Sequence, residues 1–118
     1  MYPVYSKIDI KPGRKTRIHN PPFETYLTRD SVWKFHIGFS INLTTQETFQ
    51  RFNPHRITFF TNSQGQPMVY IEFVYTIPNL SMAAINIDNY LPQLNKETAK
   101  RRDTITKFGA DASKSSRP

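Results

Sequence analysis

The chain has 118 residues, with sixteen Lys and Arg residues against nine Asp and Glu residues and a net charge of +7. This length suits one domain that buries a modest core without covalent cross-links. The sequence contains no cysteine, which excludes a disulfide framework, thiolate chemistry and cysteine-ligated zinc or iron–sulfur sites. We predict a single domain over residues 1–108 and a disordered tail over 109–118, whose residues are mostly small and polar.

The positive charge is concentrated toward both ends of the chain. Residues 1–34 contain seven basic and three acidic residues, and residues 95–118 repeat that ratio. Residues 35–94 contain two basic and three acidic residues, together with most of the aromatic side chains. A hydrophobic centre with two cationic flanks favours a polyanionic partner, most often nucleic acid.

The N-terminal residues lack the apolar stretch of a secretory signal, and no apolar run is long enough to cross a bilayer. These patterns predict an intracellular protein, cytoplasmic or nuclear, or one made inside a host cell if it is viral. We also expect that the protein has no membrane partner and no small-molecule substrate.

The first third of the chain predicts one short strand, one irregular segment and one long strand. Residues 2–10 alternate weakly, which is typical of a short edge strand. Residues 11–31 contain several prolines and a dense basic cluster, so we expect a basic arm or loop, since Pro and Gly break regular structure. Over 32–43, polar residues alternate strictly with six large apolar ones, which predicts a half-buried strand; these are Trp33, Phe35, Ile37, Phe39, Ile41 and Leu43.

The centre of the chain predicts a turn of helix and a hairpin. Thr45 is a possible N-cap for a short helical turn that Pro54 ends. Residues 56–62 and 68–77 predict a hairpin, and the second strand has apolar groups on both faces, as in a central strand. A lone strand carboxylate such as Glu72 is expected to pair across the sheet with Arg56 or Lys34.

Helical spacing returns in the last third of the chain. It predicts a helix over about 81–90, which ends there because Pro92 breaks the helical pattern. A strand over 82–88 is the alternative. A second helix over about 96–107 is expected to start at Asn95 and to stop before Gly109. Strands first and helices last predict an α+β fold, in which an antiparallel sheet is followed by one or two C-terminal helices.

Cations interleaved with aromatic rings are what single-stranded nucleic acid requires, because ammonium and guanidinium groups bind phosphates and rings stack on bases. In the alternative interpretation the rings pack the arm onto the body and the charges are only solvated. The polar face of strand 32–43 offers Lys34, His36, Ser40 and Asn42 as a further surface, unless it is an ordinary solvated face. The predicted nucleic-acid-binding residues are Lys11, Arg14, Lys15, Arg17, Tyr26, Arg29, Lys34, Lys96, Lys100, Arg101, Arg102 and Lys107.

Signals for catalysis are weaker. His36 and His55 with Lys34 would supply the groups of an acid–base ribonuclease, but the sequence does not show that the histidines meet. The carboxylates have no metal-binding spacing, and no glycine-rich phosphate loop occurs. We therefore predict no catalytic residue, no metal site and no cofactor.

The resulting hypothesis is a non-enzymatic protein that binds single-stranded nucleic acid or RNA largely independently of sequence. Self-association into a homo-oligomer is also expected, because so small a domain has few helices to cover its apolar strands. A second hypothesis is a small structural or assembly protein, of viral coat, matrix or scaffold type, whose basic ends neutralise a genome or an acidic partner. A His-based ribonuclease is the third.

Overall fold

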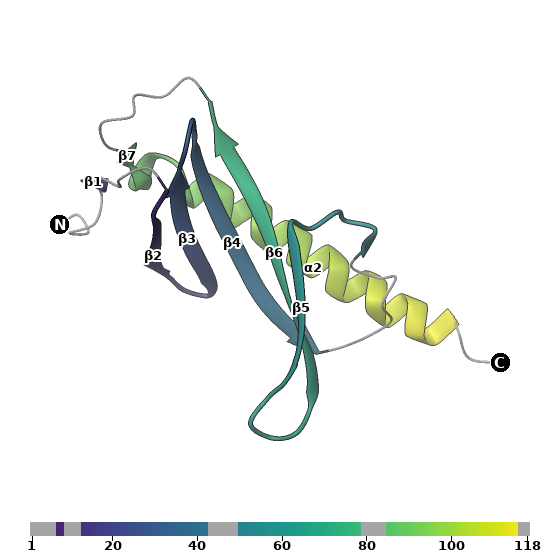
Figure 1. Cartoon of the computed structure of the whole chain (residues 1–118). Coiled ribbons are helices and arrows are strands. Elements are labelled where there is room, and N and C mark those ends of the chain that lie inside the picture. The colour runs from purple at the N-terminus through teal and green to yellow at the C-terminus, as the bar shows by residue number, and fades with distance from the viewer. Residues whose placement is uncertain (1–6, 9–12, 43–49, 79–84, 116–118) are drawn as a thin grey trace.

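A computed structural model describes residues 7–8, 13–42, 50–78 and 85–115. Its main body is a five-stranded antiparallel sheet of order β2-β3-β4-β6-β5, crossed on one face by the C-terminal helix α2 (Figure 1). The predicted α+β fold is confirmed. The elements are β1 (Lys7–Ile8), β2 (Lys15–Asn20), β3 (Phe23–Arg29), β4 (Trp33–Asn42), β5 (Arg56–Thr61), β6 (Pro67–Ile77), β7 (Ile85–Asn86), the 3₁₀ turn η1 (Ile87–Asn89) and α2 (Leu91–Ser115).

The arm or loop predicted over 11–31 is wrong, because β2 and β3 form a hairpin there. Pro21 and Pro22 occupy the two-residue turn between the strands, and the peptide bond that joins them is cis. A proline at a turn position gives up no ladder hydrogen bond, so the prolines delimit the strands rather than disrupt them. Gly13, with φ of +82°, precedes β2 and donates its N–H to the Arg29 carbonyl at 2.9 Å.

The two strongest strand predictions are confirmed. β4 matches the expected strand over 32–43, and β5 and β6 form the expected hairpin. Between them, the Asn62 side chain accepts N–H bonds from Gln64 and Gln66, both at 2.9 Å, and Gly65 takes a φ of +79°. An Asn that bonds the backbone ahead of it and a glycine at positive φ are the usual chemistry of such a turn.

Alternation along the strands separates the sheet into a covered face and an open face. The covered face, which α2 packs against, contains the core. The open face, as we name it, consists of the intervening positions, for which the structure describes no covering helix. Fully buried core side chains from the sheet are Leu27, Trp33, Phe35, Ile37, Val69 and Ile71.

Of the one or two C-terminal helices that the sequence predicts, the described residues form one α-helix, α2. α2 begins at Leu91, so Pro92 lies in its first turn, where a missing N–H costs nothing. Asn95 is therefore not the N-cap, and Gly109 does not stop the helix, which continues to Ser115 through part of the predicted tail. A stripe with seven-residue spacing, Leu91, Thr98 and Ile105, is buried against the sheet.

The helix predicted over 81–90 is also wrong in the part that the structure describes. Ile85 and Asn86 form β7, which pairs with β1, and η1 follows directly. This agrees in part with the alternative strand over 82–88. Of the strand predicted over 2–10, Lys7 and Ile8 are described and are strand, while the helical turn predicted from Thr45 falls largely outside the described residues.

A pair of asparagine side chains connects the end of the β2–β3 hairpin to α2. The Asn20 amide donates to Asn95 Oδ1 at 2.9 Å, and the Asn95 amide donates back to Asn20 Oδ1 at 2.8 Å. Both residues are partly buried. The pair therefore satisfies two amides that water reaches poorly, and it fixes the hairpin against the helix.

We expect Asn20→Ala and Asn95→Ala each to lower the free energy of unfolding by about 1–2 kcal/mol, because each substitution removes the hydrogen-bond partner of the other side-chain amide. Urea denaturation would measure this, and the double variant should lose less than the sum of the two. Asn42→Ala, at an exposed position on β4, is the control, with an expected change within about 0.5 kcal/mol. Equal losses at all three positions would contradict the assigned role of the pair.

Candidate nucleic-acid interface

The open face brings cations and aromatic rings together from four strands. The Lys15 ammonium lies 4.0 Å from the centre of the Tyr26 ring, a cation–π contact between neighbouring strands. A cavity of about 210 Å³ opens on this face. It is lined by Lys15 of β2, Glu24 and Tyr26 of β3, Arg56 and Thr58 of β5, and Tyr70 and Glu72 of β6. Since both edges of the sheet line one cavity, the open face is concave.

Gly38 of the central strand β4 lies beneath Tyr70, which lines this cavity. A β-carbon at position 38 would overlap the hydroxyl group and ring of Tyr70, so the tyrosine lies directly over the glycine backbone. Glycine within a strand often marks such a close approach. The register places Gly38 beside both Glu24 and Glu72.

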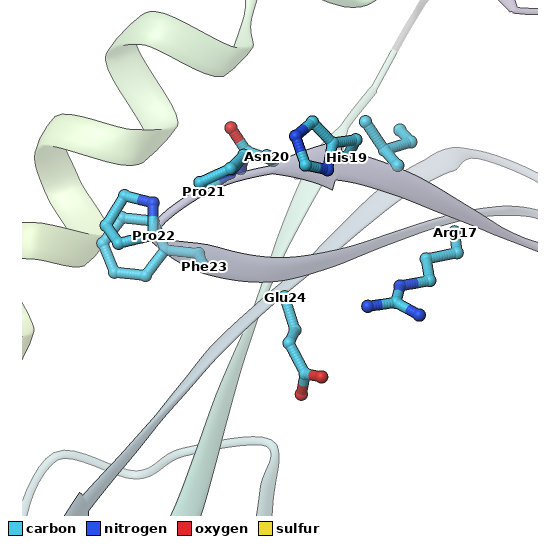
Figure 2. A pocket seen from close by; sticks show the side chains of 8 residues that line it. Arg17, His19, Asn20, Pro21, Pro22, Phe23 and Glu24 are labelled. Carbon is cyan, nitrogen blue, oxygen red and sulfur yellow. The ribbon is translucent and has the colours of Figure 1, made fainter.

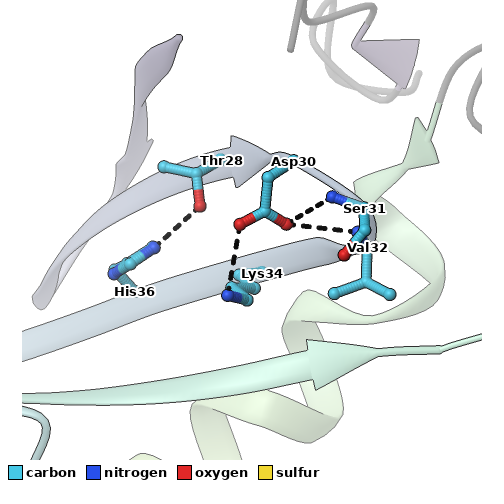
Figure 3. Close-up of polar contacts among 6 residues, drawn as sticks. All are labelled: Thr28, Asp30, Ser31, Val32, Lys34 and His36. Atoms are coloured by element: carbon cyan, nitrogen blue, oxygen red, sulfur yellow. Dashed lines mark hydrogen bonds and ion pairs between the residues drawn. The ribbon is translucent and has the colours of Figure 1, made fainter. Parts of the chain in front are cut away.

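A chain of polar side chains runs beside the cavity. Thr28 Oγ1 lies 2.8 Å from His36 Nε2 (Figure 3), and His36 Nδ1 lies 3.3 Å from Glu72 Oε2. The Tyr70 hydroxyl donates to the other carboxylate oxygen, Oε1, at 3.3 Å. Glu72 is 2 % exposed, so this carboxylate is buried within its partners.

Burial disfavours the charged form of Glu72, but the hydrogen bond and charge of His36, with Lys15 and His55 beyond it, outweigh burial and lower the pKa of the carboxyl. Burial raises the pKa of the Tyr70 phenol, and the neighbouring carboxylates of Glu72 and Glu24 raise it further. Glu72 is therefore ionised at neutral pH, while Tyr70 keeps the proton that it donates.

His55 completes this group from the segment before β5. Its backbone N–H donates to the Glu72 carbonyl at 2.8 Å, and its ring lies edge-on to that of His36, with 5.6 Å between the ring centres. The structure thus brings together the two histidines of the ribonuclease hypothesis. Lys34, the third component, is paired with Asp30 at 3.4 Å.

Lys34 is held at the β3–β4 turn rather than beside the histidines. Figure 3 shows its ammonium directed at Asp30, which also accepts the N–H groups of Ser31 and Val32. Those backbone hydrogen bonds, with Lys34, hold the pKa of the Asp30 carboxyl below its usual range. Lys34 therefore contributes little net charge to the face.

A second, larger hollow of about 440 Å³ lies at the tip of the β2–β3 hairpin. Arg17 and Glu24 project from the same side of the hairpin there, while Pro21 and Pro22 form its end beside α2 (Figure 2). Arg17 thus lies at the margin of the open face, one strand position beyond Lys15 on that side.

The structure places the predicted binding residues in several different environments. Arg14, Lys15 and Arg17 are exposed on or before β2, with Tyr26 beside them, whereas Lys11 lies outside the described residues. Arg29 is 8 % exposed on the covered face, 5.0 Å from the centre of the Trp33 ring, so it is not a surface cation. Lys96, Lys100 and Lys107 are exposed on α2, on the other side of the sheet.

Arg101 and Arg102 also lie on α2, but both are turned toward the sheet. The Arg101 guanidinium lies 4.6 Å from the centre of the Phe73 ring, and that of Arg102 lies 5.3 Å from the centre of the Phe23 ring. Their stems and head groups cover the edge of the core. These two arginines are structural in part, and they contribute less to an outward basic surface than the sequence predicts.

Sequence reasoning missed Arg56, Tyr70 and His55 as members of the interface. The predicted β5–β6 hairpin already set Arg56 opposite Glu72, but the strand order was needed to bring both to the cavity that Lys15 and Tyr26 line. Glu72 and Arg56 are in register, as expected for a cross-strand pair, although the hydrogen bonds described for the carboxylate go to His36 and Tyr70.

Comparisons with family models, curated proteins and solved structures found no match to this chain. Within the described part of the chain, no helix combines the length and hydropathy that crossing a bilayer requires.

We expect Gly38→Ala to displace the Tyr70 ring from the open face and to lower the free energy of unfolding by about 1–3 kcal/mol, as overpacking does. Chemical denaturation would measure the loss. In a Tyr70→Ala background the same Gly38→Ala change should cost little, because the overlapping ring is gone. Equal costs in the two backgrounds would contradict the close approach of Tyr70 to this strand.

Proposed function

We propose that this protein binds single-stranded nucleic acid, DNA or RNA, largely independently of sequence, on the open face of its sheet. One observation supports the proposal above others: α2 covers one face, while the other is concave and carries cations beside aromatic rings. A single strand fits such a surface because its bases are free to stack on rings while its phosphates meet cations.

The groups on the open face have distinct roles in this proposal. Lys15, Arg17 and Arg56 are exposed and contact phosphates, while Tyr26 and Tyr70 offer rings for stacking. Stacking is worth roughly 1–3 kcal/mol per base, so two rings contribute substantially. None of these contacts reads base edges, which is why we propose weak dependence on sequence.

Carboxylates on the same face limit the affinity. Glu72 is buried and hydrogen-bonded to His36 and Tyr70, whereas Glu24 is exposed and lines the cavity beside the proposed phosphate contacts. Glu24 should therefore repel a phosphate backbone, and its removal should strengthen binding.

Two triple variants that remove equal charge separate the open face from the helix. We expect Lys15→Gln/Arg17→Gln/Arg56→Gln to weaken binding to oligo(dT) by at least about tenfold at low salt and to reduce the salt slope by about 2. Lys96→Gln/Lys100→Gln/Lys107→Gln, all exposed on α2, is the matched control and should retain most of the affinity. Fluorescence anisotropy at several salt concentrations measures both quantities.

In the same titration Glu24→Gln should tighten binding, because it removes a negative charge beside the proposed phosphate contacts. The proposal fails if no polynucleotide binds at low salt, or if the helix variant loses as much affinity as the sheet variant. The second result would instead favour the basic helix as the binding element.

We further propose that two copies associate through the edge strand β5. In the described part of the chain β5 pairs with β6 alone, and Phe59 and Phe60 on it are 50 % and 40 % exposed. An edge strand with exposed aromatic residues is a ready surface for a second copy. Association would also multiply weak phosphate contacts through avidity.

Phe60→Lys should shift the protein toward monomer, because a charge on an edge strand opposes strand pairing. Size-exclusion chromatography with light scattering measures the mass, and Ser40→Lys, exposed on the central strand β4, is the control that should leave it unchanged. A wild-type monomer at high concentration would contradict the association. Large shells or filaments would instead favour the structural or assembly role.

A further inference from the structure

We propose that His36, His55 and Glu72 form a binding site for a divalent transition-metal ion, and that zinc is the ion this ligand set fits best. The site borders the proposed nucleic-acid surface, since Glu72 lines the same cavity, but its test is independent of that proposal because ion binding is measured with no polynucleotide present. Two imidazoles and one carboxylate are a common three-ligand set for zinc, and they leave a fourth position for water or a substrate atom.

The distances between the ligand atoms fit this role. One ligand atom from each of the three residues lies within 4.8 Å of the other two. Tetrahedral zinc with bonds near 2.05 Å separates its ligand atoms by about 3.3 Å. His36 Nδ1 and Glu72 Oε2 are already 3.3 Å apart. His55 is exposed, so rotation of its side chain can close the remaining gap.

The neighbouring hydrogen bonds orient both buried ligands as metal sites require. Thr28 Oγ1 lies 2.8 Å from His36 Nε2, so an Nε2–H donated to it leaves Nδ1 with a lone pair directed at the ion. Tyr70 donates to Glu72 Oε1, which leaves Oε2 for the ion. Both outer partners are in place before any ion binds.

The electrostatics also favour a cation at this position. The Glu72 carboxylate is 2 % exposed and lies against the imidazoles of His36 and His55. Zinc takes histidine as the neutral imidazole and glutamate as the carboxylate, so binding releases to solvent any proton that these ligands carry. Lys15 and Arg56 line the same cavity as Glu72, and their positive charge opposes a second cation there.

Isothermal titration of untagged wild-type protein with zinc chloride at neutral pH should show one saturable ion per chain. His55→Gln should weaken binding by at least about tenfold, and so should Glu72→Gln. His19→Gln is the matched control, because His19 is the third histidine, is exposed and lies outside the cluster. It should leave the affinity unchanged.

Glu72 is buried, so unfolding of its variant would also abolish binding, and His55→Gln keeps the test decisive because His55 is exposed. Visible absorption of the cobalt-loaded protein adds a second readout, with intense bands expected for a four-coordinate ion in wild type and their loss in His55→Gln. The outer partners are tested by Thr28→Val and Tyr70→Phe, each expected to weaken binding by about tenfold. Absence of saturable binding, or an equal loss in His19→Gln, overturns the site.

Discussion

The packing of α2 across one face of a single-layer sheet is the constraint on which the other features depend. Thr98 illustrates it: the residue is fully buried, donates to the Leu94 carbonyl at 2.8 Å and meets the Tyr75 hydroxyl at 2.8 Å. Ile105 lies about two helical turns further along α2 and is also fully buried. Because the helix takes the apolar face, polar side chains of all five strands collect on the opposite one, where the concave surface and its charged groups lie.

The fold was predictable where side-chain alternation was strong. The strict period of two across β4, and the hairpin of β5 and β6, identified the centre of the sheet from residue type alone. The sequence did not predict the β2–β3 hairpin, because two adjacent prolines such as Pro21 and Pro22 are as typical of an irregular loop as of a tight turn. Likewise, Pro92 resembles a helix breaker but lies in the first turn of α2, which only the position of the helix start reveals.

The proposed binding residues were predictable by type but not by face. The sequence identified Lys15, Arg17 and Tyr26, yet it could not show that Arg56, far along the chain, lines the same cavity, because strand order is a tertiary property. It also counted Arg101 among the surface cations, although packing on Phe73 turns that guanidinium inward. The meeting of His55 with His36 and Glu72 depends equally on the pairing of β4, β6 and β5.

The most direct measurement of the central claim is an NMR titration of the protein with oligo(dT), following side-chain resonances that report one face each. If the strand binds on the open face, the Nε–Hε signals of Arg17 and Arg56 and the ring signals of Tyr26 should shift on addition of the oligonucleotide. The side-chain ammonium signals of Lys96 and Lys100 on α2 should remain in place. Shifts concentrated on the helix, with the open face unchanged, would contradict it.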